Sequence, residues 1–403
     1  MQARELTSST KASVLGISAT TVVHSAGHGT AALWSAAAKG RTGLRRNDLA
    51  WCDLPCWVGP VPGVDETRLP AALRHWDCRN HRLAWLALQD AEFRNAVGKA
   101  TAQRGAHRVG LVLGTSTSGI RSTEIAYAKR RETGVWPPDF DYRSTHSVES
   151  VCRFGAEVLG LAGPMVTIST ACSSSAKVFL TALRWIDAGL IDAAVVGGID
   201  SLCLSTLHGF HSLQLLSDEI CRPFDVERGG ISIGEAAGFA LLDRAPAEVS
   251  LAGGGESSDA WHMSSPHPEG QGAREAIRAA LAAAGLTAAD IGYVNAHGTG
   301  TLANDRAEAA ALRAVFGEQG VPVSSTKGVT GHTLGAAGIV EAIVTVQALK
   351  EQALPPSTNL RTPDPTLALD VVAKPRIAKL RHAMSNNFGF GGTNCSLIFS
   401  RSE

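Results

Sequence analysis

The sequence predicts an α/β protein built from two similar halves. Runs of β-branched residues bounded by Gly alternate with Ala-rich helical runs along most of the 403 residues. A strand, a Ser/Thr turn and an Ala-rich helix occur once in each half, at VTISTACSSSA and at VPVSSTKGVTGHTLGAAG, which indicates an internal duplication. The length exceeds that of a usual single domain, so one large core or two fused cores of similar size are both expected.

The first half is predicted to begin with a strand and a helix. After Ala12, the β-branched run SVLGISATTVV predicts the strand and the Ala-rich run GTAALWSAAAKG predicts the helix. Residues 45–80 show no steady period and are expected to form an irregular surface excursion. We then expect one helix at HRLAWLALQDAEF (81–93), a buried strand and polar turn at RVGLVLGTSTSG (108–119), and a polar segment without assigned elements as far as Glu149.

A strand, a sharp polar turn and a helix are predicted within residues 164–189. The helix places Val178, Ala182 and Ile186 on one face, and Gly189 suits the C′ position at which it ends. Two further strands, at IDAAVVGGIDSL and ISIGEAAGFALLDR, complete the first half.

The second half, which starts after about residue 245, repeats this order of elements. A helix at REAIRAALAAAG (274–285) is followed by a capped turn, TAAD, and by a strand, IGYVNAHGTGT. A helix over residues 305–316, a strand at VPVSSTK and a buried helix from Gly335 to Leu349 follow.

Composition excludes several functional classes. Lys plus Arg and Asp plus Glu each number 37, so the formal net charge is zero and no overall field attracts nucleic acid or an anionic membrane. Neither a signal-peptide core nor a run of about 18 apolar residues is present, so we expect a cytoplasmic protein without a membrane span. The 8 cysteines lack CxxC pairs and zinc spacings, which predicts reduced thiols and no metal site. The Gly-rich runs lack phosphate-binding spacings, so no nucleotide site is expected.

Cys172 is the first candidate for chemistry. An arbitrary cysteine is more often a small buried hydrophobe, but this one follows VTIST and precedes three serines that suit the start of a helix. At such a start, unpaired N–H groups and the helix dipole are expected to lower the thiol pKa and favour the nucleophilic thiolate. The same N–H groups would form part of an oxyanion hole.

A nucleophile needs partners, and two histidines lie in turns of small residues. His297 lies in NAHGTGT after a predicted strand, and His332 lies in TGHTLGAAG before a predicted helix. A single histidine in a turn is usually structural or solvated. Two of them in Gly/Thr loops at strand ends favour a catalytic pair, because α/β folds expose their reactive groups there.

Two pairs of charged residues flank these turns. For Asp305 and Glu308 alone, a surface salt bridge is the simpler interpretation. Lys327 stands between STK and GVTGH in an apolar stretch, so if buried it would need a carboxylate such as that of Glu341.

Four motifs, TACSSS, NAHGTGT, STKGVTGH and NNFGFGGTN, occur in the same order as in the β-ketoacyl-[acyl-carrier-protein] synthase I/II family, which this chain resembles from about Ala12 to Ser400. The run CRPFDVERGGISIGEAAG is similar to that family's RPFDxxRDGxxxGEGAG. The resemblance implies a thiolase-like fold, in which two duplicated α/β halves stack as a five-layer αβαβα sandwich. Residues 12–247 would form the half with the nucleophile, and residues 248–400 the half with the two histidines.

The resemblance also implies the activity of a 3-oxoacyl-[acyl-carrier-protein] synthase, an acyltransferase. Cys172 would take an acyl chain from the carrier protein, and His297 and His332 would donate hydrogen bonds to the malonyl thioester as it loses carbon dioxide. The backbone N–H groups of Cys172 and Phe390 would form the oxyanion hole. Phe388 and Phe390 would gate the malonyl site.

Further roles are implied by position in the family motifs. Thr299 and Thr301 match residues that hold the phosphopantetheine arm, which arrives on the acyl carrier protein, so no resident cofactor is expected. Four charged residues match a buried network that orients the histidines: Lys327, Glu341, Asp305 and Glu308.

Three positions depart from the family pattern. Gly229 stands where Asp is usual, Ile231 where a pocket-lining Phe is frequent, and Ala236 where Gly is common. A smaller side chain at Ile231 should reshape the acyl tunnel, which argues against ordinary fatty-acid elongation. The phrases GFHSLQLLSDEICRPF and GESSDAWHMSSPHPEG are similar to a subgroup from aryl-polyene pathways, whose members pair with a chain-length-factor homologue. A homodimer or such a heterodimer is therefore expected.

Four alternatives share parts of this pattern. A catalytically silent chain-length-factor subunit would lack the nucleophile, which is present here. A degradative thiolase uses a second cysteine in a C-terminal Gly-rich loop, whereas Cys395 has a strand-like context. Synthases that prime on acyl-CoA have Asn where His332 stands. A cysteine hydrolase must admit water, which a loop gated by phenylalanines would exclude.

Overall fold

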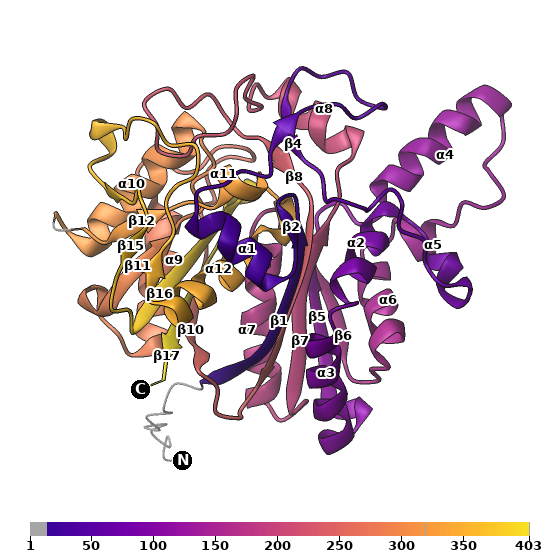
Figure 1. Ribbon diagram of the computed structural model, residues 1–403, viewed down its shortest axis with the longest axis horizontal. Coiled ribbons are helices and arrows are strands. Elements are labelled where there is room, and N and C mark those ends of the chain that lie inside the picture. Colours follow the sequence, from indigo (N-terminus) through magenta and orange to yellow (C-terminus); the bar gives the residue numbers. More distant parts are fainter. Residues whose placement is uncertain (1–13, 319, 403) are drawn as a thin grey trace, which may run out of the picture.

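The computed structural model describes residues 14–318 and 320–402. Within them, one sheet of 12 strands runs through the molecule and consists of two half-sheets joined edge to edge (Figure 1). The strands of the N-terminal half-sheet are β1 (Leu15–His24), β5 (Val109–Gly114), β6 (Met165–Ile168), β7 (Ala193–Asp200) and β9 (Ala236–Asp243), with β2 (Gly27–His28) paired to β1. The strands of the C-terminal half-sheet are β10 (Val249–Ser258), β11 (Ile291–Asn295), β12 (Pro322–Ser324), β14 (Asp370–Val371), β16 (His382–Gly389) and β17 (Thr393–Arg401).

The two half-sheets have the same topology. In the first, β6, β5 and β7 are parallel, and β9 and β1 follow antiparallel. In the second, β12, β11 and β16 are parallel, and β17 and β10 follow antiparallel. They meet at a short antiparallel pairing of β1 with β10, where Leu15 faces Leu251 and Gly16 faces Ser250. This repeat confirms the predicted duplication.

The helices complete five layers. On the outer face of the first half-sheet lie α2 (Arg79–Ala87), α3 (Ala91–Arg104) and α6 (Ser150–Leu159). On the outer face of the second lie α9 (Gln271–Ala284) and α10 (Leu302–Phe316). Between the half-sheets lie α7 (Ser174–Asp187) and α12 (Ala337–Glu351), with α1 (Thr30–Ala38) beside α12 (Figure 1). The predicted αβαβα sandwich is therefore confirmed.

The other helices and strands lie outside these layers. They are α4 (Ile120–Thr133), α5 (Tyr142–Thr145), α8 (Leu204–Ser212), α11 (Lys327–Thr330), β3 (Arg45–Arg46), β4 (Trp57–Gly59), β8 (Ile233–Gly234), β13 (Ala353–Leu354) and β15 (Arg376–Ile377). The excursion over residues 45–80 contains β3, β4 and one 3-10 turn before α2 begins at Arg79, so the expected irregular segment is confirmed.

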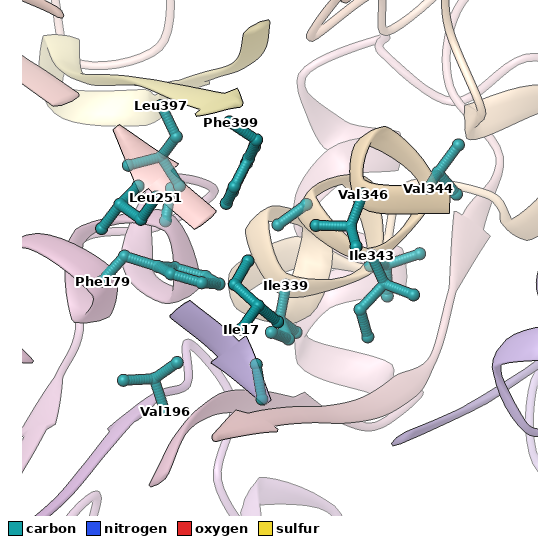
Figure 2. Close-up of a cluster of buried hydrophobic side chains, with 14 of the residues drawn as sticks. Ile17, Phe179, Val196, Leu251, Ile339, Ile343, Val344, Val346, Leu397 and Phe399 are labelled. Carbon is teal, nitrogen blue, oxygen red and sulfur yellow. The ribbon is translucent and has the colours of Figure 1, made fainter. Parts of the chain in front are cut away.

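Helix α12 lies at the centre of the core. Its sequence, AGIVEAIVTVQALKE, is apolar on nearly every side because the helix contacts both half-sheets and α7. Figure 2 shows Ile339 and Ile343 of α12 among side chains of the N-terminal half, including Ile17 and Val196, while Phe399 approaches from β17. The helix therefore joins the two halves through one continuous apolar cluster.

Two expectations about the elements are wrong, and each has a physical reason. Residues 81–93 do not form one helix, because α2 ends at Ala87 and Asp90 caps a new helix, accepting a hydrogen bond from the N–H of Phe93. The polar segment before Glu149 contains α4, which projects from the body (Figure 1). Only Ala126 of α4 is buried, so the helix has no apolar stripe to reveal it.

The other elements that the sequence predicts match the structure closely. Gly189 adopts a left-handed φ of 69° just after α7, and the turn at residues 287–290 has the expected capping box. Residues 12 and 13, at the start of the predicted first strand and half, lie outside the described residues. The division of the chain after residue 247 stays a prediction.

Candidate active site

Cys172 lies in a tight bend between β6 and α7. The bend passes through Ala171, whose φ of 52° is unusual for a residue with a side chain. Ser174 stabilises it, because its hydroxyl donates to the carbonyl of Ala171 at 2.6 Å and accepts from the N–H of Thr170 at 2.9 Å. Thr393, at the start of β17, also donates to the carbonyl of Thr170 at 3.0 Å. The nucleophile candidate is thus held by both halves of the protein.

The resting thiol of Cys172 does not have the lowered pKa that the helix start predicts. Burial raises the pKa of Cys172 to about 11, and this effect exceeds the opposing influence of the Lys327 cation and of the N–H of Phe390, which donates toward the sulfur. The side chain is 5% exposed. Desolvation of the thiolate therefore outweighs the neighbouring groups that favour it.

His332 faces the sulfur directly. Its Nε2 lies 3.0 Å from Sγ of Cys172, and its Nδ1 accepts a hydrogen bond from the N–H of Leu334 at 3.2 Å. Because Nδ1 is an acceptor, the ring proton must be on Nε2 when the ring is neutral. The imidazole thus presents an N–H donor to the sulfur and to the cavity beside it.

His297 is oriented by the buried cation of Lys327. Nζ of Lys327 donates to the carbonyl of His297 at 2.5 Å and lies 3.2 Å from its Nδ1. An ammonium group can only donate, so Nδ1 of His297 accepts and its Nε2 carries the proton. Lys327 also forms a buried ion pair with Glu341, whose other oxygen accepts from the side-chain amide of Asn387 at 2.5 Å.

Both imidazoles are neutral at physiological pH. Burial lowers the pKa of His297 and of His332 well below the usual value, and the Lys327 cation lowers both further. The ring centroids lie 5.3 Å apart. Two neutral N–H donors therefore converge beside one thiol, an arrangement suited to stabilising negative charge on a small oxygen atom.

Glu308 and Asp305 are buried, so the surface salt bridge considered for them is wrong. Glu308 accepts hydrogen bonds from the N–H groups of His297 and Gly298, both at 2.8 Å. Asp305 accepts from the N–H of Gly300, in the same turn, at 3.2 Å and from the N–H of Phe224 at 2.9 Å. Burial raises the pKa of Glu308 to about 7, although the hydrogen bonds from the N–H groups of Gly298 and His297 lower it. Glu308 thus holds the backbone of the histidine, and Asp305 holds the loop beside it.

A cavity with an open volume of about 660 Å³ connects these groups to the surface. Phe388 and Phe390 line it, and the ring of Phe388 lies 6.0 Å from that of His297. Thr299 and Thr301 line the same cavity, with their hydroxyl oxygens 3.0 Å apart. The apolar part of the wall comes from Ile231, Phe210 and Leu215.

One thiol and two imidazoles also form a donor set for a soft cation. The ligand atoms of Cys172, His297 and His332 lie within 4.8 Å of one another, and neutral imidazole is the form that binds metal. The resting tautomers work against such a cation, because binding it through Nε2 would move each proton to Nδ1, where Leu334 and Lys327 already donate.

Several residues of the site escaped the sequence analysis. Ala171 gives no local sign of its positive φ, and Phe210 reaches the cavity from a helix outside the four motifs. Asn387 lies inside NNFGFGGTN and could have been singled out as a buried donor for Glu341. Asp259 and Asn394, which are hydrogen-bonded at 2.7 Å on the cavity wall, follow no recognisable spacing.

In the part of the chain that the structure describes, no helix combines the length and apolar character needed to span a bilayer.

Comparisons with known proteins agree with this geometry. Residues 80–247 match the model of the beta-ketoacyl synthase N-terminal domain, and residues 249–361 match that of the C-terminal domain. Nodulation protein E of Rhizobium meliloti is 37% identical over 333 residues, which are 79% of this chain and 82% of that protein. The 3-oxoacyl-[acyl-carrier-protein] synthase 2 of Vibrio cholerae is 38% identical over 321 residues, 74% of this chain and 77% of that protein.

Solved structures give the same result. The ketosynthase ApeO, solved in complex with its chain length factor ApeC from Xenorhabdus doucetiae, is 37% identical with a TM-score of 0.86, covering 96% of this chain and 98% of that one. A beta-ketoacyl synthase from Burkholderia phymatum is 29% identical with a TM-score of 0.85, covering 96% and 99%. Family models, relatives and fold thus agree, and the chain belongs to the beta-ketoacyl synthase family of condensing acyltransferases.

Proposed function

We propose that this chain is a 3-oxoacyl-[acyl-carrier-protein] synthase in which Cys172 holds the growing acyl chain and His297 and His332 stabilise the decarboxylating malonyl unit. One observation carries the proposal. A buried thiol and two neutral imidazole N–H donors, whose tautomers are set by Leu334 and Lys327, converge in one cavity.

The first step transfers an acyl chain from carrier protein to enzyme. The sulfur of Cys172 attacks the thioester carbonyl, and the N–H groups of Cys172 and Phe390 receive the developing oxyanion. The bond to the phosphopantetheine sulfur then breaks, and the proton of the Cys172 thiol passes to that leaving group, so no net proton is consumed. The raised pKa of the resting thiol keeps it protonated until a substrate is bound.

The second step forms the carbon-carbon bond. The Nε2–H groups of His297 and His332 donate to the thioester oxygen of malonyl-carrier protein, so the bond to its carboxylate breaks and carbon dioxide leaves an enolate. The enolate carbon attacks the acyl carbonyl on Cys172, and the bond to sulfur breaks. The released thiolate takes up one proton, and the 3-oxoacyl chain departs on the carrier protein.

This chemistry requires that water be kept away from the reacting groups. The enolate would be wasted if water protonated it, and the acyl-enzyme would be lost if water hydrolysed it. Phe388 and Phe390 line the path to the sulfur, and Phe390 packs against Phe210 with a centroid distance of 5.4 Å. We assign the hydroxyl groups of Thr299 and Thr301 to the phosphopantetheine arm, and no resident cofactor takes part.

We assign the chain to a specialised pathway of the aryl-polyene or type II polyketide kind. Ile231 is 2% exposed and lines the cavity where the family often has a larger side chain, which leaves room for a stiff, unreduced acyl chain. The likeness to the ketosynthase ApeO over almost the whole chain supports this assignment. Fatty-acid elongation, the reaction named for the relative from Vibrio cholerae, is the second outcome to test.

A second subunit of the same fold is the expected partner. Strand β6 ends the sheet and pairs on one side with β5, while Met165 and Val166 are exposed there. The neighbouring projection at α4 exposes Tyr127 and Trp136. The ketosynthases ApeO and the ishigamide enzyme were both solved with a chain length factor, which favours a heterodimer over a homodimer. We place the complex in the cytoplasm, where acyl carrier protein is its second partner.

Intact-protein mass spectrometry after incubation with acyl-carrier-protein thioesters tests this function. Wild type should gain one acyl group and release it as a 3-oxoacyl product on addition of malonyl-carrier protein, whereas Cys172→Ala should gain none. Cys203→Ala is the matched control, because Cys203 is also buried but bonds to Thr206 outside the cavity. No adduct from any donor, even with a candidate partner present, would leave this chain as a silent subunit.

A further inference from the structure

Asp200 is a buried carboxylate that none of the proposed steps uses. It is the last residue of β7 and is 0% exposed. Within residues 14–318 and 320–402 it takes part in no ion pair, so its charge is compensated by hydrogen bonds alone. Burial of such a carboxylate costs free energy, so its role is expected to lie with the groups that donate hydrogen bonds to it.

One set of donors comes from the loop that follows β5. Oδ1 of Asp200 accepts from the hydroxyls of Thr115 and Thr117 at 2.7 and 2.8 Å, and from the N–H of Thr117 at 2.8 Å. The N–H of Ser116 lies 2.9 Å from the same oxygen and 3.0 Å from Oδ2. The first oxygen is therefore anchored within the N-terminal half.

The other oxygen reaches the histidine turn in the C-terminal half. Oδ2 accepts from the N–H of Gly335 at 2.5 Å. The preceding residue, Leu334, has a φ of 52°, a left-handed conformation that leucine rarely adopts without external constraint. In this conformation the N–H of Leu334 points at Nδ1 of His332. A side chain at Gly335 would place its Cβ 2.7 Å from the carboxylate, so only glycine fits.

We infer that Asp200 is a positioning residue for His332, which holds Leu334 in its left-handed conformation through Gly335 and thereby keeps the proton of His332 on Nε2. This inference rests on the proposed function, because the Nε2–H is the donor to the malonyl oxygen. Without the contact, the turn relaxes, Nδ1 loses its donor, and the imidazole can adopt the other tautomer or rotate away from Cys172.

Asp200→Asn breaks this contact selectively. An amide has one oxygen and one NH2 group, and the oxygen should take the place of Oδ1, where most of the donors converge. The NH2 group then opposes the N–H of Gly335, donor against donor. We expect kcat for decarboxylation of malonyl-carrier protein to fall about 100-fold, the loss typical of a catalytic group displaced by about 1 Å. KM should stay within about twofold, because the substrate contacts remain.

Thiol reactivity separates positioning from general damage. Asp200 is one of the charges that raise the pKa of Cys172, together with Glu341 and against Lys327. The neutral variant should therefore react with iodoacetamide at least as fast as wild type at about pH 8, while its decarboxylation is slow. Parallel loss of both activities would mean that Asp200 serves only the packing of the site.

Rescue at Leu334 gives the sharpest test. Glycine adopts the left-handed conformation without cost, whereas alanine does not, and both delete the same leucine side chain. In the Asp200→Asn background, Leu334→Gly should recover about tenfold of the lost kcat, and Leu334→Ala should recover none. Equal behaviour of the two double variants would overturn the mechanism. If Asp200→Asn does not fold, Gly335→Ala, which forces the carboxylate away from the turn, should show the same loss of kcat.

Ser175→Ala is the matched control for lost contact between the halves. The hydroxyl of Ser175 in α7 accepts from the N–H of Ile339 in α12 at 2.9 Å, four residues beyond Gly335 and outside the histidine turn. Its kcat should stay within about threefold of wild type. A loss equal to that of Asp200→Asn would refute the inference. If wild type itself decarboxylates no malonyl-carrier protein, the proposed function fails first, and that result is distinct from a normal rate in Asp200→Asn.

Discussion

Replacing Lys327 by methionine should reveal what its buried ion pair contributes to stability and, separately, to activity. The side chains of Lys327 and Glu341 are 1% and 3% exposed, so the variant leaves a carboxylate in the core with the amide of Asn387 as its remaining donor. Removal of one partner from such a pair costs about 3–5 kcal/mol of unfolding free energy. Burial already raises the pKa of Glu341, and loss of the cation raises it further.

The sign of the pH dependence follows from that shift. A carboxyl group whose folded-state pKa is above its unfolded value of about 4.3 is stabilising below that value and destabilising as pH rises through the folded pKa. The stability deficit of Lys327→Met should therefore be smaller at about pH 5 than at about pH 8. The double variant Lys327→Met/Glu341→Leu removes both charges and should recover wild-type stability to within about 1 kcal/mol.

Activity should not return with stability. In both variants Nδ1 of His297 loses the ammonium donor that keeps its proton on Nε2. We expect decarboxylation to fall about 100-fold, as when one oxyanion donor is removed. Urea unfolding followed by circular dichroism measures the first effect, and carbon dioxide release from malonyl-carrier protein measures the second. A single variant as stable as wild type, or a double variant with full activity, would refute this account of the ion pair.

Two further predictions follow from the cavity. Because the pKa of Cys172 is raised to about 11, alkylation by iodoacetamide should rise about tenfold per pH unit from about pH 7 to 9, and a plateau below about pH 9 would contradict the burial argument. Ile231→Phe should narrow the cavity beside Phe210 and lower kcat/KM for the longest acyl donor about tenfold or more. Competition between acyl donors measures this preference, with Ile231→Val as the control. Equal chain-length preferences in the two variants would show that Ile231 does not line the acyl tunnel.

The three central residues can be found from sequence because each lies in a turn of small residues next to a strand or helix. Such turns gather at one end of an α/β sheet, so the sequence predicts that Cys172, His297 and His332 meet there. The duplication of the halves follows from the alternation of strands and helices. The five layers and the roles in the supporting network are suggested by the family resemblance.

The rest depends on the folded environment. The pKa of Cys172 is raised mainly by burial, which its position at the start of a helix does not reveal. Asp305 accepts a hydrogen bond from Phe224, a residue distant in the sequence, only in the folded chain. Asp200 ends an apolar strand and looks like an ordinary strand terminus, since its donors lie 85 and 135 residues away. Helix α4 lacks an apolar stripe, and a single capping residue, Asp90, divides one expected helix into two.

Helix α12 also constrains how the nascent chain can fold on the ribosome. The N-terminal half is complete at Asp243, but the helix that covers its inner face ends about 100 residues later, at Glu351. At a synthesis rate of about 5–20 residues per second, this delay lasts roughly 5–20 s. During that time Ile17, Phe179 and Val196 are not yet packed against α12. The nascent chain therefore exposes an aggregation-prone apolar surface, which a chaperone would have to bind until translation is nearly finished.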